Sequence, residues 1–208
     1  MRARYWLAIA AAGIVLAWLA GSTQAAIRGS AHDFSAAVWN PSGEICLPCH
    51  TPHHANTSVT DAPLWNHAVT GATFQIYQSS TIRATDLGQP SGRSKLCLSC
   101  HDGTVALDSF GGRTGTRFMT GPSLLGTNLR GTHPISFTYN DALATLDRQL
   151  YPPSSRTSGL GSTVQRDMLF NNKMECSSCH DVHNRFNIDP MLLKSNAGSA
   201  LCLTCHSL

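Results

Sequence analysis

The sequence is poor in the features with which a soluble chain of its length usually builds a core. Only 13% of the 208 residues are charged, and 15 Lys and Arg stand against 12 Asp and Glu. The chain has no basic run and no stripe of basic and aromatic residues, which excludes nucleic acid as a partner. With 17 Gly and 10 Pro, it also has too little periodic apolar sequence for an ordinary core of this size.

Cysteine is absent except in one pattern, Cys-x-x-Cys-His, which occurs four times and uses all eight cysteines. This pattern is the attachment signature of c-type haem, whose two vinyl groups take the thiols while the His binds the iron. The sequence therefore predicts four haem c groups as cofactors. The covalent attachment residues are Cys46, Cys49, Cys97, Cys100, Cys176, Cys179, Cys202 and Cys205. The proximal iron ligands are His50, His101, His180 and His206.

Two other uses of paired cysteines fit the pattern less well. Four Cys-x-x-Cys pairs are able to form two Cys₄ zinc sites, or disulfides in an exported protein. Neither requires a His directly after every second Cys. With 10 His in 208 residues, four such coincidences have a chance probability of about one in 10⁵.

The first 25 residues have the pattern of a signal peptide. Arg2 and Arg4 precede an apolar run over residues 6–20, and Thr23 and Ala25 supply small residues at a cleavage position. The run is short for a membrane span, and residues 21–23 break it, so we expect cleavage and no membrane anchor afterwards. Secretion, to the periplasm or beyond the cell, suits a chain that carries haem c.

The predicted fold class is a multihaem cytochrome c, loop-rich with a few short α-helices and little β-structure, in which the haems form the core. We expect one domain over residues 26–208. A short helix is predicted over residues 102–110. A second one is predicted to begin at an Asn140 cap, to bury Leu143, Leu146 and Leu150 on one face, and to end at Pro152.

The motifs form an internal repeat. Each half has one Cys-x-x-Cys-His-x-x-His followed by one Leu-Cys-Leu-x-Cys-His, so residues 26–110 are predicted to hold haems 1 and 2 and residues 166–208 haems 3 and 4. Residues 111–165, rich in Gly, Ser and Thr, are expected to form an irregular connection.

Six further His can supply the sixth ligand of four irons. His53 and His183 lie three residues after a proximal His, too close to reach the opposite face of the same haem. We therefore expect His53 to bind haem 2 and His183 to bind haem 4, with His54 as the local rival of His53. The distal ligands of haems 1 and 3 are then expected to come from three candidate His residues, with Met as an alternative ligand type. These candidates are His32, His67 and His133.

Three candidates for two irons leave a surplus. The spare His is either a surface residue or a ligand to the haem of a neighbouring subunit, and His32, on the N-terminal arm, suits the second role. Ligation by two His residues favours a low reduction potential, whereas a Met ligand raises it.

With these residues in place, the chain resembles the doubled-CXXCH multihaem cytochromes of metal-reducing bacteria, and among them the OmcE-like four-haem cytochromes that polymerise into extracellular filaments. The matching stretches are residues 32–35, 46–53, 63–67, 96–110, 133–139, 176–184 and 196–206. The resemblance implies stacked bis-His haems and one iron per subunit bound by a His of the adjacent subunit, with His32 as the candidate. His54 stands where the resemblance implies Asn.

Three functions follow from these patterns. The first is electron transfer along the haems of an extracellular homopolymer, towards other redox cytochromes or extracellular acceptors. The second is a soluble periplasmic tetrahaem shuttle. The third is a reductase that acts on a substrate at one open iron; six spare His for four irons disfavour it, so we expect no enzyme and no catalytic residues.

Overall fold

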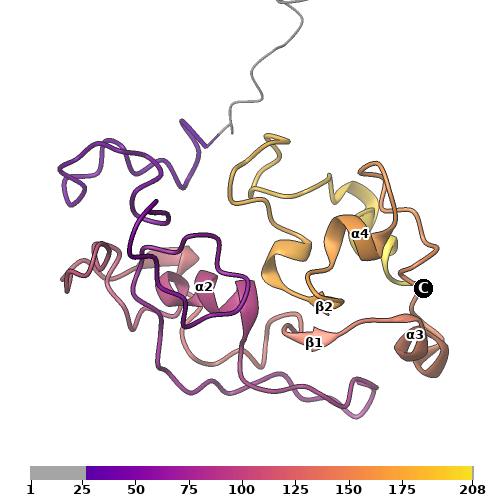
Figure 1. The fold of residues 1–208 in the computed structure, drawn as a ribbon. Helices are drawn as coiled ribbons and strands as arrows, with labels where there is room; N and C mark the ends of the chain where they lie inside the picture. The colour runs from indigo at the N-terminus through magenta and orange to yellow at the C-terminus, as the bar shows by residue number, and fades with distance from the viewer. Residues whose placement is uncertain (1–26, 208) are drawn as a thin grey trace, which may run out of the picture.

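The computed structural model describes residues 27–207, and most of this chain lies in turns and loops (Figure 1). The predicted leader at residues 1–25 lies outside the described residues. The α-helices are α2 (Gly92–His101), α3 (Asp141–Asp147) and α4 (Val164–Met168). The 3-10 helices are η1 (Gly121–Ser123), η2 (Cys176–Ser178), η3 (Ala197–Ser199) and η4 (Cys202–Thr204). Over the described range, no helix is long and apolar enough to cross a membrane.

A single short sheet joins two distant segments. Strand β1 (Phe137–Thr138) pairs antiparallel with β2 (Lys173–Met174), with Phe137 opposite Met174. Figure 1 shows this sheet together with α3 and α4 on one side of the molecule and α2 on the other. The prediction of a loop-rich chain with few short helices and little β-structure is confirmed.

The apolar side chains form two small clusters rather than one core. The larger one collects residues from β1, β2, α3, α4 and the C-terminal segment, and the smaller one surrounds Leu98 of α2. The larger cluster consists of Phe137, Tyr139, Ala144, Val164, Met168, Leu169, Met174, Leu193 and Leu201. The smaller cluster consists of Phe74, Leu98 and Leu129. Clusters this small do not form a full core by themselves, which is consistent with haems that supply further apolar surface.

The helix predicted over residues 102–110 is wrong, because helix α2 ends where that segment begins. Gly103 has φ +73°, which does not continue a helix. The Asp102 carboxylate accepts hydrogen bonds from the Thr104 backbone N–H at 2.7 Å and from the Thr70 hydroxyl at 2.5 Å. A side chain that bonds the backbone two residues ahead stabilises a turn instead of a helix.

The helix predicted at Asn140 exists, but its end and one of its buried positions were wrong. The Asn140 side chain accepts the Leu143 backbone N–H at 2.9 Å, so the predicted cap is confirmed. The helix ends at Asp147, where Arg148 takes a left-handed conformation with φ 65°, well before Pro152. Leu146 is 61% exposed, and Ala144 is instead the buried residue of α3.

Replacing Asn140 by Ala is expected to lower the free energy of unfolding by about 1 kcal/mol, because it removes the acceptor for one of the free N–H groups of α3. Denaturant titration of the haem-loaded protein measures this loss. Asn140→Ser is the control, since Ser also caps helices. An equal loss in both variants would contradict the cap as the cause.

Candidate functional site

The Cys-x-x-Cys-His motifs share one local conformation. In the first motif the backbone N–H groups of Cys49 and His50 both donate to the Cys46 carbonyl, at 3.1 and 2.8 Å. The third and fourth motifs repeat this turn, and the second occupies the last residues of α2. Each motif thus compresses two thiols and one imidazole into a single turn, as attachment to one porphyrin edge requires.

Three of the four proximal imidazoles are oriented by a backbone carbonyl. The Nδ1–H of His50 donates to the Pro63 carbonyl oxygen at 2.6 Å. In the same way, His101 donates to Ser123 at 2.8 Å, and His180 donates to Pro190 at 3.1 Å. Since a carbonyl only accepts, Nδ1 carries the proton and Nε2 keeps its lone pair for a metal. Sequence reasoning missed these carbonyls, because a backbone group has no residue-type signature.

Three motif imidazoles face a second imidazole. The ring centroids of His50 and His183 lie 6.1 Å apart. Those of His32 and His101 lie 6.1 Å apart, and those of His133 and His206 6.3 Å. A metal–imidazole bond of about 2 Å plus a ring radius of about 1 Å on each side separates two trans ligands by about 6 Å. Each pair therefore has the spacing of two axial ligands on one iron.

In each pair, one imidazole has a lowered pKa, which favours the neutral form that binds metals. Burial lowers the pKa of His32, and the nearby His101 lowers it further. Burial also lowers the pKa of His206, reinforced by His133, and that of His183, where Asp181 opposes the shift. Neutral imidazoles are available for coordination without first losing a proton.

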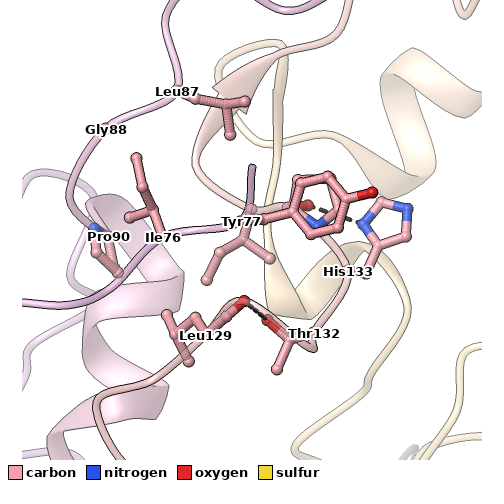
Figure 2. A pocket seen from close by; sticks show the side chains of 10 residues that line it. Ile76, Tyr77, Leu87, Gly88, Pro90, Leu129, Thr132 and His133 are labelled. Atoms are coloured by element: carbon pink, nitrogen blue, oxygen red, sulfur yellow. Dashed lines mark hydrogen bonds between the residues drawn. The ribbon is translucent and has the colours of Figure 1, made fainter. Parts of the chain in front are cut away.

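The His133–His206 pair borders a pocket of about 270 Å³. Phe137, Leu150 and Cys205 also line it, so that the fourth motif opens onto an apolar space. His133 also lines the smaller neighbouring pocket, where its Nδ1–H donates to the Pro134 carbonyl at 2.8 Å, beside Tyr77 (Figure 2). Its Nε2 is therefore free for a metal.

The cysteines are all free, and burial raises the pKa of the second thiol in every motif. These pKa values are about 11 for Cys49 and Cys205 and about 12 for Cys100 and Cys179. Within residues 27–207, no three His, Cys, Asp or Glu side chains converge to hold a metal ion. The pairs are therefore not arranged as Cys₄ zinc centres.

Three buried polar atoms near the motifs have no hydrogen-bond partner in the described chain: Trp65 Nε1, Arg93 Nε and Ser177 Oγ. Trp65 packs edge-on against His50, Arg93 lies one turn before Cys97 in α2, and Ser177 is inside the third motif. Buried donors of this kind need an acceptor. The carboxylate-bearing haem supplies such acceptors, so the donor set and the ring pairs fit this cofactor.

The motifs lie beside one another in chain order. Asn66 donates its backbone N–H to the Cys49 carbonyl at 2.9 Å, and the next residue, His67, has Nε2 3.7 Å from Cys100 Sγ. Two consecutive residues therefore link motifs 1 and 2. The Cys205 thiol lies close to Cys179, and both pack on the larger cluster, which links motifs 3 and 4.

Motifs 2 and 3 meet across the two halves of the sequence. The Cys97 and Cys176 thiols contact one another, and the hydrogen bond between them raises the pKa of Cys97. The Cys176 backbone N–H donates to Ser94 Oγ at 2.9 Å. The four attachment sites thus form one continuous series, 1–2–3–4.

The distal candidates are not placed as the sequence repeat suggested. His183 faces His50 of motif 1 instead of motif 4, because residues 181–184 fold back in a turn towards the first half. His133 takes the place beside His206. His32 faces His101 of its own chain, and His67, only 2% exposed, lies at Cys100 of motif 2.

Four His remain outside these pairs, and the buried His67 beside Cys100 is one of them. His53 and His54 are exposed, and no ring pair places either beside motif 2, where His53 was expected. The exposed His180 forms no pair of this kind within residues 27–207. His180 is nonetheless among the groups that lower the pKa of His32, so these two imidazoles lie within electrostatic reach of each other.

A comparison with protein families finds a match over residues 169–207 to the family described as "Doubled CXXCH motif". This range contains motifs 3 and 4. No curated protein matches the chain. The match supports a multihaem c-type cytochrome that binds haem covalently and transfers electrons.

Proposed function

We propose that the chain binds four haem c groups and transfers electrons along them, as the subunit of an extracellular homopolymer. The observation that carries this proposal is the continuous series of attachment sites, in which motifs 1 and 2, 2 and 3, and 3 and 4 are in contact. When bound, each haem supplies an iron that alternates between the ferric and ferrous states.

The residues of the chain hold this series in place. The cysteine pairs fix each porphyrin edge, and the carbonyls of Pro63, Ser123 and Pro190 keep three proximal imidazoles in the metal-binding tautomer. The distal ligands in this proposal are His183 for motif 1, His32 for motif 2 and His133 for motif 4. Paired His ligands keep the potentials low and leave no open iron at these motifs.

The exposed His180 supports assembly. We propose that its iron takes a ligand from a neighbouring subunit, and His53 lies exposed on the surface, where it could supply one. Because His32 faces His101 within its own chain, we assign the ligand between subunits to His53 instead. We also propose that residues 1–25 act as a signal peptide, that the protein is secreted, and that it passes electrons to acceptors outside the cell.

The lack of a ring pair at His180 also favours a second candidate function, a reductase. A reductase needs one open iron, and the iron at His180 would be open if no other residue bound it. A monomeric shuttle instead requires that residues of one chain supply the distal ligands of all four irons. The state of the His180 iron therefore separates the three functions.

Carbon monoxide binding by reduced protein tests the proposal directly. We expect one haem in four to bind carbon monoxide in dispersed subunits and none in filaments seen by electron microscopy. A site that stays reactive in the assembled protein would identify the reductase. Subunits that bind none, and never form fibres, would identify the shuttle.

His53→Ala is expected to leave four haems attached and to abolish fibre formation, because it removes the ligand for the neighbouring subunit. Haem staining of purified protein and electron microscopy measure the two properties. His54→Ala is the matched control, an adjacent exposed His. Normal fibres from the His53 variant would remove this residue from the junction.

A further inference from the structure

The contact between motifs 2 and 3 contains a buried carboxylate, Glu175, which directly precedes Cys176 and is 2% exposed. Its Oε2 accepts the Ser94 backbone N–H at 3.1 Å and the Ser136 hydroxyl at 3.1 Å. Ser94 in turn accepts the Cys176 backbone N–H. The carboxylate therefore lies between α2, which carries motif 2, and the start of motif 3.

The surrounding residues are shaped to admit this carboxylate. The α2 N-terminus lacks a side-chain cap from Ser91, and Glu175 bonds the free N–H of Ser94 in its place. Gly92 has φ +50°, and a Cβ there would lie 3.0 Å from Glu175 Oε1. A larger residue at position 92 would push the carboxylate out of its place.

The charge on this carboxylate is not paired with a cation. The ion pair that the described chain forms is Arg185 with Asp181, elsewhere in the molecule. The Arg93 guanidinium is stacked 3.7 Å above the Phe170 ring, and its Nε bonds nothing in the described chain. Lys173 Nζ donates to Ser91 Oγ at 3.4 Å. Glu175 therefore has hydrogen bonds but no direct ion pair, with Arg93 acting on it only from a distance, and a buried charge acts strongly on its neighbours.

We propose that Glu175 is a positioning and tuning residue that lowers the reduction potentials of haems 2 and 3 below those of haems 1 and 4. A negative charge beside the Cys97 and Cys176 thiols favours the ferric over the ferrous state at both attached haems. The inference rests on the proposed function, since it requires haem at both motifs. Haems 2 and 3, at the centre of the series, would then be harder to reduce than haems 1 and 4 at its ends.

Glu175→Gln tests this by potentiometric titration of the haem-loaded protein. Gln keeps the size and an acceptor oxygen but loses the charge. We expect the potentials of two haems to rise, each by about a tenfold change in the ferrous-to-ferric ratio at fixed potential, or about 59 mV for one electron. Ser136→Ala removes a donor and leaves the charge less screened, so it is expected to shift the same two haems downwards.

Glu44→Gln is the matched control, because Glu44 is the other glutamate, lies two residues before Cys46 and is exposed. Water screens an exposed charge, so its removal is expected to leave all four potentials in place. A purely structural role predicts shifts of the same sign in the Glu175 and Ser136 variants, and this result would overturn the inference. Unchanged potentials in a four-haem Glu175 variant would overturn it too, while leaving the proposed function intact. Wild-type protein that binds no haem at motifs 2 and 3 would instead contradict the proposed function.

Discussion

Replacing His183 by Ala is expected to convert the haem at Cys46 and Cys49 to high spin and to leave the haem at Cys202 and Cys205 unchanged. The reason is the 6.1 Å spacing and near-parallel stacking of the His183 and His50 rings. Removing a distal imidazole leaves a five-coordinate iron, so about a quarter of the haem changes spin state. Electron paramagnetic resonance counts the high-spin fraction, and structure determination of the variant locates the altered iron.

His54→Ala is the control for this experiment, because the exposed His54 faces none of the proximal imidazoles in the described chain. A spin change at the fourth motif would restore the doublet pairing that the sequence repeat suggested. The result would also conflict with the His133–His206 pair, whose centroids lie 6.3 Å apart.

Replacing His32 by Ala is expected to turn the haem at Cys97 and Cys100 to high spin while fibres still form. His32 lies in the same chain as the His101 that it faces, 6.1 Å away, so its loss opens an iron within the subunit. Resonance Raman spectroscopy reports the new high-spin haem, and electron microscopy reports the assembly.

The opposite result would carry equal information. A His32 variant that forms no fibres and keeps a low-spin haem at Cys97 and Cys100 would show that this residue acts between subunits, as the family resemblance implies. Comparison with His53→Ala makes the assignment unambiguous. We expect the His32 variant to lose a ligand within the chain and the His53 variant to lose assembly.

Local structure was the part most accessible to prediction from the sequence. The haem attachment residues and proximal His are predicted from a five-residue pattern, and the structure closes that pattern in a hydrogen-bonded turn. The Asn140 cap is equally local and was found where expected. The helix end at Arg148 was not, because a left-handed residue without Gly has no clear sequence signal.

The distal His residues show how the folded chain places side chains differently from what the sequence repeat suggested. Proximity in sequence suggested that His183 serves its own half of the chain. Residues 181–184 instead fold in a turn, with the Asn184 N–H on the Asp181 carbonyl, and His183 lies beside motif 1. Contacts between residues far apart in sequence depend on the path of the whole chain, which a repeat does not encode.

The sequence by itself indicated that this chain binds haem covalently and predicted the number of groups and the atoms that attach them, since covalent attachment depends on residues within one turn of each other. Only the tertiary structure decided the order in which the motifs touch and which imidazoles face each other. It also decided where Glu175 is buried, between Ser94 and Ser136. These features depend on loops that have little regular structure, so they are set by long-range packing and hydrogen bonds rather than by local residue preference.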